Sequence, residues 1–152
     1  MQEDNQQLAE IKSLYTKIRS TLKQARQAAY KQVNLAMIRC YWEIGCLIVE
    51  HEQKGDVRAE YGKSVLEEVS KRLTSDFGKG YSAQNLRYMR QFYLTFQKCH
   101  AVSGKLNLSY LRPELSWTHY RSLLRVENEA ARMWYMNEAA DQNWSTRQLD
   151  RQ

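Results

Sequence analysis

The stretch SVLEEVSKRLTSDFGKGYSAQNLRYMRQFYLTFQ, residues 64–97, determines how this chain is expected to fold. Apolar residues recur three and four positions apart on both sides of a glycine-containing segment, which is the spacing of two amphipathic helices. Gly78 favours a helix end, because glycine readily takes the left-handed backbone conformation. Ser82 is a good N-cap for the helix that follows. The stretch therefore predicts a helix, a turn and a second helix over 83–97.

The second of these helices is predicted to have an apolar face and a polar face. The apolar face is expected to hold Leu86, Met89, Tyr93 and Phe96. The polar face is expected to hold Gln84, Arg87, Gln91 and Lys98, with Arg90 on its flank. Such a unit has the outline of a DNA-binding helix-turn-helix, in which Arg and Gln bond guanine and adenine edges in the major groove. Phosphate contacts at the turn are expected from Lys79, Tyr81 and Ser82.

The distribution of charge favours an anionic partner. No Asp or Glu occurs from Lys79 to Pro113, and the six basic residues there equal the whole formal net charge of +6. These residues are Lys79, Arg87, Arg90, Lys98, Lys105 and Arg112. A basic block on one unit is typical of binding to a phosphate backbone, so DNA is the expected partner. One alternative is a plain helical hairpin with a solvated polar face. Another is that Arg87 and Arg90 pair with acids of other helices, such as Glu67 or Glu68.

The rest of the chain is predicted to be helical as well. Strand patterns are weak, and the 152 residues contain one proline and six glycines, so the fold class is all-α. Residues 6–53 predict one long helix of roughly 70 Å at about 1.5 Å per residue. The alternative is a kink near residues 28–31. Gly45 in this helix indicates that another backbone approaches closely.

The long helix carries the heptad spacing of a coiled coil. Its seam holds Leu8, Ile11, Tyr15, Ile18, Leu22, Ala25 and Ala29. After one residue of drift the seam resumes at Val33, Met37, Cys40, Ile44 and Leu47. Residues 1–55 are therefore expected to form an arm and core helix through which the chain forms a homodimer. Residues 56–152 are expected to form the domain that contains the helix-turn-helix.

Three short helices are predicted near the C-terminus. They are expected to begin after Ser116, at Glu127 or Asn128, and after Ser145. The aromatic residues of this region are expected in the core: Trp117, Tyr120, Trp134, Tyr135 and Trp144. His119 is expected to be a hydrogen-bonded structural residue. Arg121 and Arg125 share one helix face and form a candidate secondary phosphate site.

Five segments in this order resemble the N-terminal domain of the YhcG family. They are YWEIG (41–45), AEYGK (59–63), FGKGYSAQNLRYMRQFY (77–93), LSWTHYRSLLRV (115–126) and NWSTRQLDRQ (143–152). The resemblance implies a domain that precedes a nuclease domain of the PD-(D/E)xK type. The last pattern stops at Gln152, so we expect a longer native protein. A more distant similarity, to the helix-turn-helix domain of ParB-like partition proteins, supports DNA binding by analogy of fold.

Catalysis by this chain alone is not expected. The family's nuclease signature is absent, since Glu10-Ile11-Lys12 and Glu52-Gln53-Lys54 match only its acid-x-Lys tripeptide on a predicted helix. The three histidines and three cysteines lack metal-ligand spacing, so we expect neither a metal nor a cofactor. Unpaired cysteines, a polar N-terminus and no membrane span favour a cytoplasmic location. The sequence therefore predicts a DNA-binding and assembly module that positions a nuclease domain. The alternative is a protein-interaction module without DNA contact.

Overall fold

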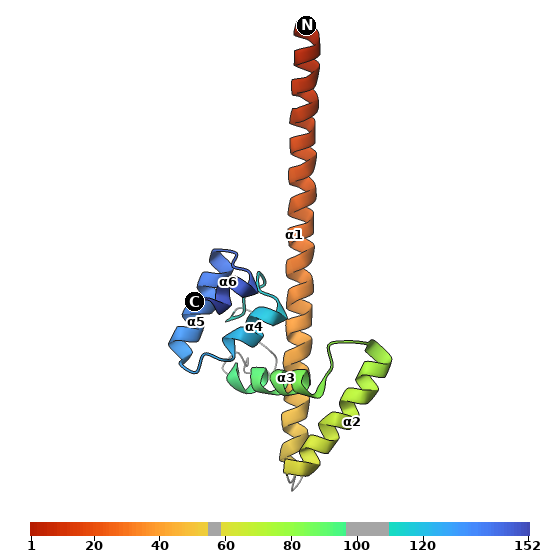
Figure 1. Ribbon diagram of the computed structural model, residues 1–152, viewed down its shortest axis with the longest axis vertical. Helices are drawn as coiled ribbons and strands as arrows, with labels where there is room; N and C mark the ends of the chain where they lie inside the picture. The colour runs from red at the N-terminus through yellow and green to blue at the C-terminus, as the bar shows by residue number, and fades with distance from the viewer. Residues whose placement is uncertain (55–58, 97–109) are drawn as a thin grey trace.

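The computed structural model describes residues 1–54, 59–96 and 110–152, and the long elements within these ranges are all α-helices. The helices are α1 (Gln2–Gln53), α2 (Ala59–Phe77), α3 (Ala83–Thr95), α4 (Trp117–Leu123), α5 (Glu129–Asp141) and α6 (Thr146–Asp150). Figure 1 shows α1 as a long rod, with the other helices gathered around its C-terminal half. The predicted all-α class is confirmed, and so is the single long N-terminal helix.

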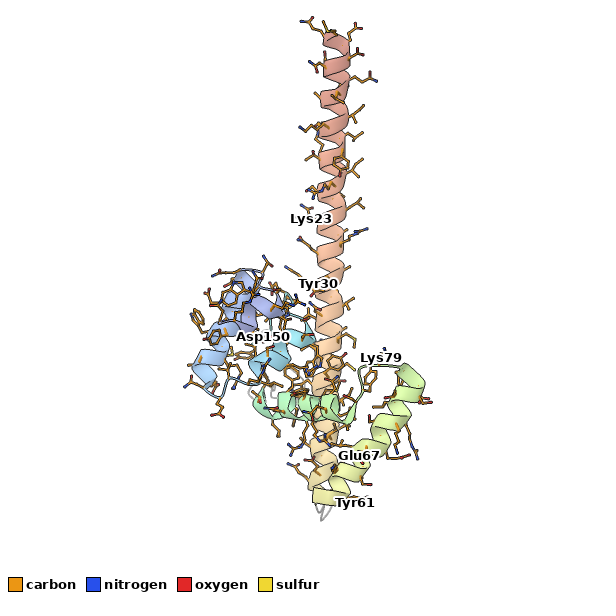
Figure 2. All side chains as sticks on the ribbon, in the orientation of Figure 1. Lys23, Tyr30, Tyr61, Glu67, Lys79 and Asp150 are labelled. Carbon is orange, nitrogen blue, oxygen red and sulfur yellow. The ribbon has the colours of Figure 1, made fainter. Side chains whose placement is uncertain are left out.

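The N-terminal part of α1 is an arm that extends away from the rest of the molecule (Figure 1), and it contacts the body at its base, where Lys31 Nζ lies 3.9 Å from Glu114 Oε1. Every residue from 1 to 33 is exposed. Figure 2 shows Lys23 and Tyr30 on this part of the helix. The helix continues through residues 28–31, where the alternative placed a kink. The chain therefore has an exposed arm, residues 1–33, and a body formed by the remaining described residues.

The body is organised around a close crossing of α1 and α3. A Cβ atom added to Gly45 would lie 2.2 Å from the carbonyl oxygen of Met89 and 2.8 Å from the Cβ of Tyr93. A contact of 2.2 Å is far inside van der Waals separation, so only glycine allows the two backbones to approach this closely. The predicted role of Gly45 is confirmed.

The C-terminal half of α1 buries a different face from the one that its apolar seam predicted. Its buried residues are Asn34, Ile38, Trp42, Gly45 and Val49. Val33 and Leu47 of the expected seam remain 60% and 64% exposed. The reason is that α3 packs on the face that contains Gly45. Cys40, Ile44 and Leu47 instead line an open, mainly apolar groove of about 550 Å³ between α1 and α2.

The hydrophobic core lies where α1, α3, α4 and α5 meet. Phe92 of α3 is fully buried, and its ring packs against Tyr120 and Trp117 of α4 at centroid distances of 5.6 and 5.3 Å. Leu86, Met89 and Phe96 are buried as predicted. The expectation that Trp134 belongs to the core is wrong, because its side chain is 55% exposed and stacks edge-on against Tyr135.

Buried polar groups join the helices of the body. The side chain of Asn34 on α1 donates to the carbonyl oxygen of Pro113 at 3.0 Å. His119 Nδ1 accepts from the backbone N–H of Ser116 at 3.1 Å, while Nε2 lies 2.8 Å from the carbonyl oxygen of Trp144. The neutral tautomer with its proton on Nε2 satisfies both bonds. His119 therefore ties α4 to the segment before α6, which confirms its predicted structural role.

The variant Gly45→Ala should lower the free energy of unfolding by about 1–3 kcal/mol, since overpacking a tight contact forces backbone to move. Urea denaturation, followed by helical circular dichroism at fixed protein concentration, measures the change. Glu43→Ala, at an exposed site on the same helix, is the control and should stay within about 0.5 kcal/mol of the parent. Equal stability of the two variants would contradict the close crossing.

Candidate nucleic-acid interface

The turn between α2 and α3 is built by glycines and by the N-cap of α3. Gly78 and Gly80 have φ values of 82° and 109°, a region that favours glycine. The hydroxyl oxygen of Ser82 accepts a hydrogen bond from the backbone N–H of Asn85 at 3.1 Å. Ser82 is therefore occupied as a cap, as its sequence position predicted. Lys79 lies exposed in this turn, where Figure 2 labels it.

Asn85 fixes the turn to the rest of the body, and sequence reasoning missed it. Its side-chain nitrogen donates to the carbonyl oxygen of Gly80, and its side-chain oxygen accepts from Trp117 Nε1 at 3.0 Å. One side chain thus links the turn, α3 and α4. Tyr81, predicted to hold phosphate, is half-buried, packs edge-on against Phe77 and lines the groove between α1 and α2.

The exposed side of α3 presents the polar residues that its helical pattern predicted. Gln84 and Gln91 are exposed, and Arg87 is half-buried. Arg87 Nη1 donates to Gln84 Oε1 at 3.4 Å, and Gln91 Nε2 donates to the carbonyl oxygen of Leu124 at 3.4 Å. Gln91 therefore lies at the border between α3 and the end of α4.

Arg90 forms an ion pair with an acid on another helix of the body. Its Nε donates to both carboxylate oxygens of Glu52 on α1 at 2.8 Å. The sequence offered ion pairing of Arg90 with an acid of another helix as the alternative to DNA contact. The structure shows such a pair, but its acid is Glu52 and not Glu67 or Glu68. Arg90 thus joins α3 to the end of α1, with 39% of its side chain exposed. Lys98, the last predicted contact, lies outside the described residues.

Arg121 of α4 and Arg125 in the turn after α4 lie beside the exposed side of α3. The guanidinium carbon of Arg121 lies 4.4 Å from the ring centroid of Tyr88, and Arg121 Nε is buried without a hydrogen-bond partner. Hydrogen bonds from Gln84 and then Arg121, with the charge of Arg125, lower the pKa of the Tyr88 hydroxyl. Hydrogen bonds donated to the ionised phenol and nearby positive charge both stabilise it, so both shift the pKa in this direction.

A shallow pocket of about 360 Å³ opens between α3, α4 and α6 at this point. It is lined by Tyr88, Thr118, Arg121, Ser122, Arg125, Thr146 and Asp150. Arg125 is 73% exposed and donates to Asp150 at 3.2 Å, a pairing that leaves its guanidinium largely in water. Phosphate oxygens accept hydrogen bonds from hydroxyl groups and guanidinium groups, and this pocket offers both side by side.

These contacts join residues that the sequence placed in two separate sites. We call the surface formed by Gln84, Arg87, Tyr88, Gln91, Arg121 and Arg125 the basic face. Tyr88 was not predicted to belong to it. The available signal was its position four residues after Gln84, which places both on one side of a helix.

A metal site and a membrane span are both absent from the part of the chain that the structure describes. Residues 1–54, 59–96 and 110–152 contain no group of three His, Cys, Asp or Glu side chains arranged to hold a metal ion. Among the same residues, no helix combines the length and the apolar character that crossing a membrane requires. The basic face is the candidate site because polar and basic side chains of α3 and of the α4 region meet there around a pocket.

Comparisons with known proteins identify relatives of this chain. The family described as DUF1016 N-terminal domain matches residues 17–152. A protein of Escherichia coli (strain K12) named "Putative nuclease YhcG" is 38% identical over an alignment of 151 residues. The match covers 84% of this chain and 40% of that protein. The chain thus spans well under half of the relative's length. No solved structure matches. These findings confirm the resemblance to the YhcG N-terminal domain.

The two arginines of α3 should differ in what they do for stability. Arg90→Ala should lower the free energy of unfolding by about 1 kcal/mol, because it leaves half-buried Glu52 unpaired. Arg87→Ala should change it by less than about 0.5 kcal/mol. Urea denaturation of both variants measures the two free energies of unfolding. A larger decrease for Arg87→Ala than for Arg90→Ala would contradict the role of Arg90 in the ion pair.

Proposed function

Since the chain belongs to the DUF1016 N-terminal domain family, we propose that it is a DNA-binding and assembly module that positions a nuclease domain of the same polypeptide. The nuclease part of the proposal comes from the name of the E. coli relative, of which this chain covers 40%. The DNA-binding part comes from the basic face. The assembly part comes from the exposed arm of α1.

The observation that carries DNA binding is a pair of arginines on neighbouring helices that have no acidic partner among the described residues. Among the described residues, no carboxylate pairs with Arg87 or Arg121. The α3 residues of the basic face lie in a segment without Asp or Glu. Asp150 is the acid in the adjoining pocket, and Arg125 already neutralises it. The surface therefore keeps positive charge that a phosphate backbone can neutralise with release of counterions.

The proposed binding mode uses α3 as the groove-entering helix. Gln84 and Arg87 lie in the first two turns of α3, where such helices contact base edges. Arg121 on α4 and Arg125 in the turn after it would then contact phosphates beside the groove, together with Lys79 at the turn between α2 and α3. Arg90 has no part in this mode because Glu52 holds it. The turn is positioned by Asn85, so α3 and α4 would meet DNA as one rigid unit.

The alternative function is a protein-interaction module that does not contact DNA. The observation that favours it is the large amount of exposed apolar surface on the arm, where Leu8, Ile11 and Leu22 are each more than half exposed. Surface of this kind is usually covered by protein. Assembly and DNA binding use different parts of the chain, so measurements on each can be made separately.

The DNA-binding proposal is tested by fluorescence anisotropy with a labelled random-sequence duplex across a salt series. The parent protein should bind, and its affinity should fall steeply as salt rises. The variant Arg87→Glu/Arg121→Glu should bind on the order of tenfold more weakly or worse. Its plot of log affinity against log salt should lose roughly two units of slope, one for each phosphate contact removed.

The matched control is Lys71→Glu/Arg72→Glu on α2, which makes the same change in net charge at exposed sites outside the basic face. It should keep more of the parent affinity than the double variant of the basic face. Both variants must retain the helical circular dichroism of the parent. Equal loss in both would mean that net charge alone attracts DNA, and no binding by the parent at low salt would favour the protein-interaction module.

A further inference from the structure

The arm presents an apolar stripe on the side of α1 opposite to the face that packs against α3, and α2 lies on the stripe side beyond the arm, where Cys40, Ile44 and Leu47 line the groove between α1 and α2. The stripe begins with Leu8, Ile11, Tyr15, Ile18 and Leu22, which are 51–65% exposed. At about 100° per residue, the centre of this stripe lies roughly 160° around the helix from the centre of the buried face, Asn34 to Val49. Other chains can therefore approach the stripe without meeting helices α3 to α6 of the body.

We propose that the arms of more than two copies of this chain associate side by side in a parallel coiled coil. The inference rests on the assembly part of the proposed function and deepens it. The occupant is another copy because the apolar spacing alternates three and four residues over 8–29, and this heptad period fits knobs-into-holes packing between identical helices.

The identities of the seam residues set the number of strands. A step of three residues leads from an a position to a d position, so Leu8 and Leu22 occupy a while Ile11 and Ile18 occupy d. Two-stranded parallel coiled coils favour the reverse arrangement, with β-branched residues at a and Leu at d. Leu at a with Ile at d shifts the preference to three or four strands.

Leu14 supports the same conclusion. It occupies the g position beside the seam and is 59% exposed. A two-stranded coil buries chiefly the a and d residues, so it would leave much of Leu14 in water. In a larger bundle each helix meets two neighbours, and a g residue is covered by the second of them. The apolar stripe is thus wider than a dimer needs.

Charge at the seam's edge sets the direction of the strands. The e positions hold Lys12, Arg19 and Arg26, and the preceding g positions hold the uncharged residues Gln7, Leu14 and Thr21. Parallel neighbours place e beside g, so each basic residue meets an uncharged one. Antiparallel neighbours would place e beside e and bring like charges together. The parallel arrangement avoids this repulsion.

A parallel bundle would place all the bodies, and therefore all the basic faces, at one end of the assembly. When several basic faces in one assembly bind the same DNA, the overall affinity exceeds that of a single face, although each face makes the same contacts as before. The face of α1 that packs against α3 lies away from the seam, so helices α3 to α6 of each copy would lie around the outside of the bundle. Assembly of the arm would thereby strengthen binding by the basic face.

Mass measurement by light scattering after size exclusion, without DNA, tests the number of strands. The full chain should have at least three times the 18.0 kDa of one chain. Ile18→Asp, with a charge in the seam, should reduce the mass to that of one chain. A dimer or a monomer of the parent would overturn the proposal. Because no DNA is present, this outcome is independent of the basic face.

Disulfide cross-linking tests the direction, in a background with Cys40, Cys46 and Cys99 changed to Ala. Leu8→Cys alone should cross-link on mild oxidation, since parallel strands bring equal positions together. A mixture of Leu8→Cys and Ala25→Cys should give no mixed product. Cross-linking of the mixture without cross-linking of Leu8→Cys alone would show antiparallel strands and overturn the proposal. The background must retain the parent's helical circular dichroism and mass.

Discussion

The close crossing of α1 and α3 is the constraint on which the rest of the body depends. Without a side chain at Gly45, the backbone of Met89 can lie against α1, and Phe92 then reaches the aromatic core shared with α4. The same crossing brings Arg90 to Glu52 and turns Gln84, Arg87 and Gln91 outward. The orientation of the candidate interface is thus a consequence of one missing methyl group on a different helix.

Local signals in the sequence predicted the elements of this fold well. The caps at Ser82, Ser116 and Ser145 and the glycine at position 78 mark helix boundaries that the structure confirms, because capping depends on residues within one turn. Interactions between distant residues could not be predicted in this way. The partner of Arg90 lies 38 residues away, and the stacking of Arg121 on Tyr88 depends on how α4 docks against α3.

The apolar pattern of α1 shows why the buried face was also missed. The seam of the arm continues along one side through Met37, Ile44 and Leu47, and from Leu35 onward apolar residues occur on nearly every side. Periodicity alone cannot then tell which side meets the body, because each side offers apolar surface. Gly45 was the informative residue, since close approach of a backbone requires its absent side chain. Small residues can thus identify a packing face that hydrophobicity leaves open.

The acid-free stretch from Lys79 to Pro113 is only partly a binding feature. Arg90 pairs with Glu52, and Arg112 pairs with Glu114 and Asp141, so two of its six basic residues neutralise acids elsewhere in the fold. The hydrogen bond to Asp141 also raises the pKa of Arg112, as expected for a charge held by its partners. Arg87 has no acidic partner among the described residues, and neither does Arg121, which lies outside the stretch and beside α3. The charge available to a ligand therefore depends on which basic residues are paired with acids in the fold. A count of charges along the sequence includes paired residues such as Arg90 and omits Arg121, which lies outside the stretch.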